Sequence, residues 1–224
     1  MQIIHALSRG TDKRKIFMDK QDYLRFIHDL FEFNDQAPAN NILYRFSRKP
    51  NSAVGHYANK EKRKLLVALH AFCLMPNHYH LLLSPLIENG VSLFMRKINV
   101  GYVKYFNQKY ERKGTLFEGR YKSVRVANES HLLHLPYYIH LNPLDLFSPG
   151  WRQHEAKNYA QCMKFLESYR WSSFLDYIGK PNFPSVTQRE FFMEFFNGPG
   201  NFKRDITGWL REAELSSIKH LTLE

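Results

Sequence analysis

The chain has 224 residues, of which 44% are hydrophobic and 24% charged, the composition of a globular protein rather than of a disordered or fibrous one. Lys and Arg outnumber Asp and Glu by 32 to 21, and such an excess favours an anionic partner, most commonly nucleic acid. The two cysteines lie far apart and no apolar run approaches the roughly 18 residues of a membrane-spanning helix. We therefore expect no disulfide framework, no membrane segment and a cytoplasmic, nucleoid-associated location.

The first part of the chain is predicted to form a strand, a helix and a long insertion. The strand covers residues 2–8, and the helix runs from an N-cap at Asp19 to about Phe33. From about residue 34 to 64 the periodicity disappears and basic residues accumulate, which predicts a basic insertion with a small hairpin around residues 42–46. A solvated loop and an arm that binds nucleic acid are both consistent with this segment.

The middle of the chain completes the order strand, helix, strand, strand, helix, strand, followed by an extra helix. The predicted elements are strands at 65–74 and 78–84 joined by a short turn, a helix at 90–110, a strand near 123–127, and a helix from a cap at Asn128 to about Leu141. This order predicts an α+β fold with a ferredoxin-like βαββαβ antiparallel sheet, whose helices pack on one face. The third strand would then have its other face free for chemistry.

The last part of the sequence is predicted to be mostly helical. Thr187 is the expected cap of a helix rich in phenylalanine, and an amphipathic helix follows from about Asn201 to Glu214. We divide the chain into a domain at 1–147 and a helical extension at 148–224.

Two histidines lie one residue apart in the predicted third strand, within the segment from Met75 to Leu83. Because successive side chains of a strand point to opposite faces, His78 and His80 share one face. Two imidazoles that point the same way can occupy adjacent positions around a divalent metal ion. Ordinary polar residues on a half-exposed strand would show the same spacing. A Cys-His zinc site with Cys73 lacks the second nearby cysteine that such sites usually have.

A second polar cluster lies on the extra helix. Tyr138 and Asn142 are four residues apart and His134 lies four before Tyr138, so the three share a helix face. A tyrosine beside a polar side chain can act as a nucleophile when a metal or base activates it, although core and surface tyrosines give the same spacing. Pro136 removes a backbone donor and predicts a kink or a restart of the helix. Tyr137 is the alternative nucleophile, about 100° away around the helix.

With these features, the sequence resembles the HUH single-tyrosine transposases of the IS200-like insertion-sequence group, in particular their REP-associated tyrosine transposase branch. The resemblance covers most of residues 1–180. It rests on segments that occur in the family's order, namely Ser8-Arg9-Gly10, Met75–Leu83, Gly114–Ser123, Tyr138–Pro143 and Tyr169–Ser173.

The resemblance implies that His78 and His80 are metal ligands, Asn142 a third, helix-borne ligand, and Tyr138 the nucleophile. It implies an enzyme dependent on Mg²⁺ or Mn²⁺ that nicks and joins single-stranded DNA at hairpin-forming sites through a 5′-phosphotyrosine intermediate, and that works as a homodimer. The residue types agree with this, because a divalent ion held by two imidazoles and one side-chain oxygen leaves positions open for phosphate oxygens.

Three basic residues are candidates for contacts with DNA. Arg9, Arg120 and Lys122 flank predicted strand ends and are candidates for phosphate contacts, which set affinity and its salt dependence. His131 and His140 are interpreted as structural, as is His134. A DNA-binding or regulatory protein that has lost catalysis is the main alternative, and an RNA-binding module on the same sheet is another.

Overall fold

The computed structural model describes residues 2–38, 63–126, 129–153, 158–212 and 223. Its strands and α-helices, in chain order, are β1 (Ile3–Arg9), α1 (Lys20–Glu32), β2 (Val67–Met75), β3 (His78–Pro85), α2 (Gly90–Lys109), β4 (Lys122–Val126), α3 (Glu129–Leu141), α4 (Tyr159–Ser168), α5 (Phe174–Tyr177), α6 (Glu190–Phe195) and α7 (Pro199–Glu212). The expected hairpin around residues 42–46, most of the basic insertion, the cap at Asn128 and the end of the last helix at Glu214 lie outside the described residues.

The four strands form one antiparallel sheet in the order β2-β3-β1-β4. β2 and β3 are joined as a hairpin in which Met75 pairs with His78, and β1 lies between β3 and β4. This is the predicted ferredoxin-like arrangement within an α+β fold. It places the first strand, which is distant in sequence, directly beside the strand that carries the two histidines.

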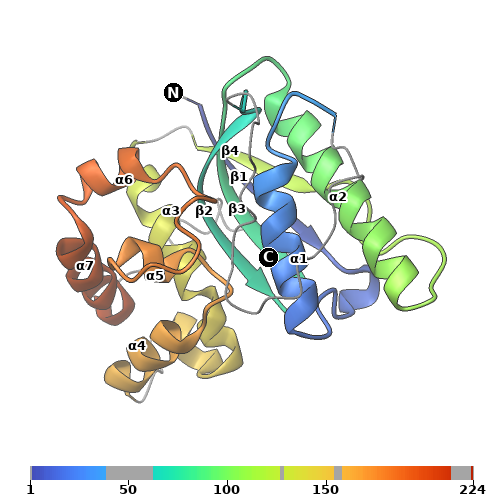
Figure 1. The fold of residues 1–224 in the computed structure, drawn as a ribbon. Coiled ribbons are helices and arrows are strands. Elements are labelled where there is room, and N and C mark those ends of the chain that lie inside the picture. The colour runs from blue at the N-terminus through green and yellow to red at the C-terminus, as the bar shows by residue number, and fades with distance from the viewer. Residues whose placement is uncertain (1, 39–62, 127–128, 154–157, 213–222, 224) are drawn as a thin grey trace.

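Helices α1 and α2 cover one face of the sheet (Figure 1). The predicted cap is confirmed, since the Asp19 side chain accepts a hydrogen bond from the backbone N–H of Asp22 and the Asp22 side chain bonds back in a capping box. Gly101 allows the close packing of α2, because a Cβ at this position would lie 2.2 Å from the ring of Phe33. The buried side chains of this layer include Phe26 and Tyr102.

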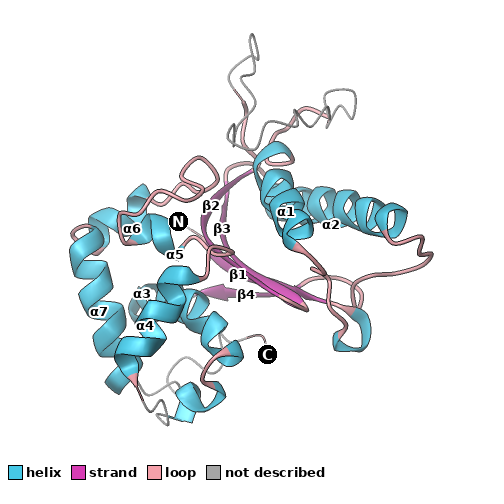
Figure 2. Cartoon of the chain, turned by 60° about the horizontal axis from the view of Figure 1, so that its bottom comes forward, coloured by secondary structure: helices cyan, strands magenta, loops and turns pink. Residues whose placement is uncertain are grey.

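The opposite face of the sheet is covered by α3 and the C-terminal helices, so that the sheet lies between two helical layers (Figure 2). We expected this face of β3 to be free, and that expectation was wrong. Leu82 of β3 shares a hydrophobic cluster with Tyr138 of α3 and with Phe202 and Leu210 of α7. The sequence of α3 is apolar on most of its surface, which suits a helix buried between a sheet and other helices.

The C-terminal region also pairs with the free edge of β2. The backbone N–H of Leu74 donates to the carbonyl of Trp171, and the N–H of Ser173 donates to the carbonyl of Phe72. An edge strand has unpaired backbone groups, and this segment satisfies several of them. The described residues between 158 and 212 therefore pack against both the edge and one face of the sheet, and the predicted domain boundary at residue 147 stays a proposal.

The cap of α6 is Arg189 rather than the predicted Thr187, which is buried two residues earlier. Among the described residues, no helix has the length and apolar character needed to cross a membrane.

Candidate metal and tyrosine site

Three histidines lie on the face of the sheet that is covered by α3. His78 and His80 come from β3 and His5 comes from β1, with Leu7 paired to His80 across the two strands. Nε2 of His5 lies 2.9 Å from Nδ1 of His80, and the rings stack with centroids 5.2 Å apart. The rings of His78 and His80 are nearly perpendicular, with centroids 4.9 Å apart. His5 and His80 are fully buried and His78 is 6% exposed.

The side chain of Asn77 determines the proton position on His78. Its Nδ2 donates to the carbonyl of Lys13 at 3.3 Å, so its Oδ1 faces Nδ1 of His78 at 2.7 Å. Because an amide oxygen only accepts hydrogen bonds, Nδ1 of His78 carries the proton. The Nε2 of neutral His78 therefore carries the lone pair with which an imidazole binds a metal.

Helix α3 brings Tyr138 to the same place. Its ring is fully buried and lies perpendicular to His80, with centroids 5.9 Å apart, and 6.0 Å from His5. The helix continues on both sides of Pro136, so the proline does not interrupt the segment that carries Tyr138. The structure thus brings the predicted nucleophile to the predicted metal-binding histidines.

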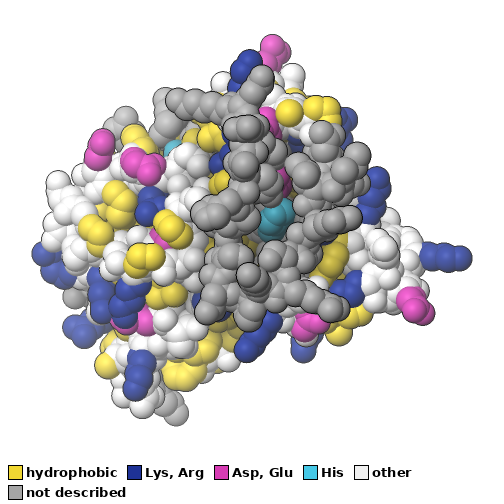
Figure 3. Space-filling view, viewed as in Figure 1, with side chains coloured by type: hydrophobic (Ala, Val, Ile, Leu, Met, Phe, Trp, Pro, Cys, Tyr) yellow, Lys and Arg dark blue, Asp and Glu magenta, His cyan; other side chains and the backbone are white. Residues whose placement is uncertain are grey.

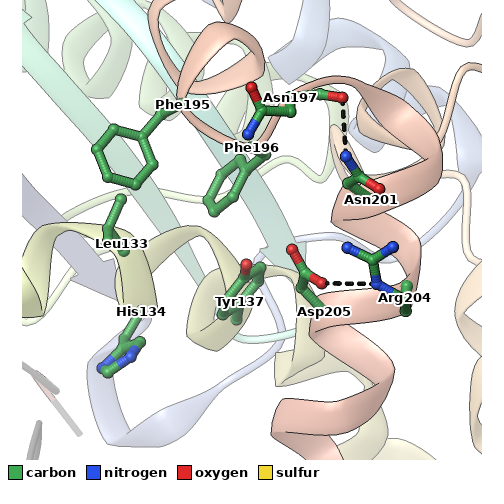
Figure 4. A pocket seen from close by; sticks show the side chains of 9 residues that line it. All are labelled: Leu133, His134, Tyr137, Phe195, Phe196, Asn197, Asn201, Arg204 and Asp205. Carbon is green, nitrogen blue, oxygen red and sulfur yellow. Dashed lines mark hydrogen bonds and ion pairs between the residues drawn. The ribbon is translucent and has the colours of Figure 1, made fainter.

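Tyr137 points to the other side of α3. It lines a cavity of about 270 Å³ between α3, α6 and α7 (Figure 4), and its ring packs on Phe196 and Phe202. Burial, and then the nearby charge of Asp205, raise the pKa of Tyr137, which makes its hydroxyl harder to ionise. Tyr137 is therefore not placed to act with the histidines.

Asn142 lies one helical turn beyond Tyr138, as predicted, and both ends of its amide are engaged. Its Nδ2 donates to the backbone carbonyl of Tyr138 at 2.8 Å, and its Oδ1 accepts from Nη2 of Arg152 at 2.8 Å. The same guanidinium forms an ion pair with Asp145 at 2.9 Å and lies 5.1 Å from the centre of the Tyr138 ring. In this structure the Asn142 oxygen therefore binds Arg152.

The donor set is compatible with a divalent ion. Two imidazoles and an amide oxygen suit Mn²⁺ and, less well, Mg²⁺, which prefers oxygen ligands. Cys73 pairs with His80 across β2 and β3, yet within the described part of the chain no group of three or more His, Cys, Asp or Glu could hold a metal ion. Metal binding at this site therefore depends on Asn142 as the third ligand. Its carbonyl oxygen has two lone pairs, so one can bind a metal ion while the other accepts the hydrogen bond from Arg152.

The predicted DNA-contacting residues lie at one end of the sheet. Arg9 pairs with His78 across β1 and β3, and Lys122 pairs with Leu7 across β1 and β4. Lys122 and Arg120 are exposed, and Arg9 is partly buried. On the face seen in Figure 3, Lys and Arg side chains are spread over several elements. Of these cations, only Arg9 pairs directly with His78, and the surface around them is generally basic on the face seen in Figure 3.

The remaining histidines of α3 differ from those of the sheet. His140 is fully buried, and its Nε2 lies 2.8 Å from the hydroxyl of Ser173. Burial lowers the pKa of His140 to about 3, so it stays neutral and serves the packing of α3. The ring of His134 lies 6.2 Å from that of Trp209, and the side chain of His131 lies outside the described residues.

Two residues of this site were not singled out from the sequence. In the sequence, His5 is assigned to the first strand and has no predicted role in the site. The ferredoxin-like order is the signal that could have identified it, because this order places the first strand beside the strand with His78 and His80. Arg152 lies in a short 3₁₀ turn at Pro149–Gln153, in a region where no periodicity was recognised, and no sequence signal connects it to Asn142.

The chain is similar to known proteins both in its sequence family and in its structure. Residues 44–142, which include all four proposed metal-binding and nucleophilic residues, match the family model described as Transposase IS200 like. A solved structure described as a REP-associated tyrosine transposase bound to a REP hairpin is similar, with a TM-score of 0.47, 14% identity and 83% of each chain covered. No curated protein matches the chain. Residues 44–142 are thus similar to the IS200-like transposase family, in agreement with the resemblance seen in the sequence.

Proposed function

We propose that this protein is a metal-dependent endonuclease and strand transferase that acts on single-stranded DNA at hairpin-forming sites. The family match supports a role as a DNA transposase. The observation that carries the finer proposal is the packing of the Tyr138 ring against His80, at 5.9 Å, on the face that also bears His78. A buried tyrosine held beside two neighbouring imidazoles is the combination that a tyrosine nucleophile and a metal site require.

In the proposed reaction, the Tyr138 oxygen attacks the phosphorus of a DNA phosphodiester and loses its proton. The bond from phosphorus to the 3′ oxygen breaks, the 3′ oxygen leaves as a hydroxyl, and the 5′ end stays linked to Tyr138. His78 and His80, with Asn142, would hold a divalent ion that neutralises charge on the phosphate. A 3′ hydroxyl can later attack the phosphotyrosine and release Tyr138, which joins DNA without an external energy source.

The DNA would approach the end of the sheet where Arg9 pairs with His78 and where Lys122 begins β4. These cations and the exposed Arg120 are placed to neutralise phosphates, which contributes affinity without reading sequence. We also propose a homodimer, which size-exclusion chromatography with light scattering would test directly.

A second candidate function is a DNA-binding protein that has lost catalysis. Two observations favour it, since Tyr138 is fully buried and the Asn142 oxygen binds Arg152. In that case the protein would bind hairpin DNA through its basic surface and form no covalent intermediate.

One experiment separates the two. The protein is incubated with labelled hairpin DNA and Mg²⁺ or Mn²⁺, and covalent protein–DNA adducts are detected on a denaturing gel. The enzyme hypothesis expects an adduct in the wild type and in Tyr137→Phe, and none in Tyr138→Phe or His78→Ala. Tight binding without an adduct under either metal would support the inactive protein, and an adduct that persists in Tyr138→Phe would exclude Tyr138 as the nucleophile.

A further inference from the structure

The side chain of His5 is fully buried between the two groups to which the proposed function assigns the chemistry. Its Nε2 lies 2.9 Å from Nδ1 of His80, and the two rings are inclined by only 20°. The ring of Tyr138 lies against it at 6.0 Å and nearly perpendicular, at 75°. A buried imidazole costs free energy unless its polar atoms are bonded, so this position requires a partner such as His80.

We propose that His5 is a positioning residue for His80, which it keeps with Nδ1 protonated so that Nε2 is available to a metal ion. This inference rests on the proposed function, because it gives His5 a role toward the metal ligand. A neutral imidazole has one N–H and one lone pair, so the proton between the rings belongs either to His80 or to His5. If His80 donates, its Nε2 keeps the lone pair; if His5 donates, Nε2 of His80 is protonated and cannot bind a metal.

The neighbouring His78 already has the arrangement that we propose for His80. Asn77 holds Nδ1 of His78 in the donor role, because its own amide nitrogen is directed to the carbonyl of Lys13. With the same arrangement at His80, both imidazoles would offer Nε2 on the same sheet face. The partner of a metal-binding histidine normally fixes its proton and its ring orientation in this way.

The role of His5 can be separated from simple packing by two substitutions. His5→Phe keeps a ring in the buried position and removes the acceptor. His5→Gln places an amide near the position of the original Nε2 and can still accept from His80. Loss of the hydrogen-bond partner of a metal-binding histidine typically weakens metal affinity by about 10-fold to 100-fold. The two variants should therefore differ in metal affinity if His5 acts through its hydrogen bond to His80.

The test measures Mn²⁺ binding to the full chain without DNA, by electron paramagnetic resonance, together with the proton positions of the histidines by ¹⁵N NMR without metal. We expect wild-type His80 to be protonated on Nδ1, His5→Phe to bind Mn²⁺ about 10-fold to 100-fold more weakly, and His5→Gln to retain most of the affinity. His70→Phe is the matched control, because His70 is another buried imidazole of the same sheet, whose Nε2 lies 2.7 Å from the hydroxyl of Ser84.

The outcomes are distinct. Protonation of His80 on Nε2 in the wild type, or equal Mn²⁺ affinity in wild type and His5→Phe, would overturn the inference. A wild type that binds no Mn²⁺ would instead refute metal dependence in the proposed function and, with it, any role of His5 toward a metal. If His5→Phe does not fold, as judged by circular dichroism, His5→Gln and the wild-type proton position decide, and a His5→Gln variant in which His80 loses Nδ1 protonation counts against the proposal.

Discussion

Arg152 donates a hydrogen bond of 2.8 Å to Oδ1 of Asn142, and its guanidinium lies 5.1 Å from the centre of the Tyr138 ring. A side chain from the turn after α3 thus contacts both helix-borne residues of the site. Asp145 holds the guanidinium in place through a second bond of 2.9 Å. Arg152 is therefore in a position to determine whether the Asn142 oxygen is available to the proposed metal ion.

Removal of Arg152 should destabilise the protein measurably. In Arg152→Ala the buried amide oxygen of Asn142 loses its donor, which typically costs about 1–3 kcal/mol of unfolding free energy. Urea denaturation followed by circular dichroism measures this difference. Arg204→Ala is the control, because the Arg204 side chain is 73% exposed and forms an ion pair with its neighbour Asp205, so a change within about 0.5 kcal/mol is expected. Equal stability of the two variants would show that the Arg152–Asn142 bond contributes little.

Asn77 should influence metal binding through His78. In Asn77→Leu the acceptor for Nδ1 of His78 is lost, and we expect Mn²⁺ affinity to fall by about 10-fold to 100-fold. Asn77→Asp retains an acceptor oxygen and should bind Mn²⁺ at least as tightly as the wild type. Isothermal titration calorimetry gives both affinities. The prediction fails if the two variants bind equally well.

The basic residues at the end of the sheet should increase the affinity for DNA through their charge and should not determine which DNA sequence is preferred. Arg120→Ala and Lys122→Ala are expected to weaken binding to all hairpin DNAs alike, and each should reduce the slope of log affinity against log salt concentration by about 1. Fluorescence anisotropy at several salt concentrations measures the slope. Lys164→Ala, an exposed lysine of α4, serves as the control. If all three variants lower the slope equally, the DNA is bound by the general surface charge instead.

Stability should fall in mild acid, in part because of His140. Its folded pKa of about 3 lies below the unfolded value of about 6.5, so between these values the unfolded chain binds a proton that the folded chain does not. The stabilisation is complete above about pH 6.5 and decreases as pH falls toward 3, by up to about 2 kcal/mol at pH 5. Burial also lowers the pKa of His70, which acts in the same direction.

The variant His140→Gln isolates this contribution. Glutamine can still bond Ser173 and does not titrate, so urea denaturation at pH 7 and pH 5 should show a smaller loss than in the wild type. The part of the pH dependence of stability that comes from His70 should remain in this variant. A loss of the same size in both proteins would mean that His140 does not stay neutral in the folded chain.

Much of the fold follows from local patterns in the sequence. Alternation predicted β3 and placed His78 and His80 on one face, and Asp19 with Asp22 forms the capping box that begins α1. These features depend on residues close together in the chain, which is why they could be predicted. The spacing of Tyr138 and Asn142 likewise follows from the helical repeat.

Other features depend on contacts between distant segments. Helices α3 and α7 pack on the sheet face that bears the histidines. The sequence shows that these helices have apolar residues, but it does not show against which surface those residues pack. The bond from His5 to His80 needs the register of β1 on β3, and the bond from Arg152 to Asn142 crosses an irregular turn. Such contacts are set by tertiary packing, which no local periodicity encodes.

The complete burial of Tyr138 has a thermodynamic consequence for the proposed reaction. A phosphate can reach its hydroxyl only in an open state, so the apparent association constant for binding that brings a phosphate to Tyr138 equals the intrinsic constant multiplied by the population of that state. Phe202 and Leu210 of α7 belong to the same hydrophobic cluster as Tyr138. The C-terminal helices would then govern how often the nucleophile is accessible, while the sheet governs how it reacts once exposed.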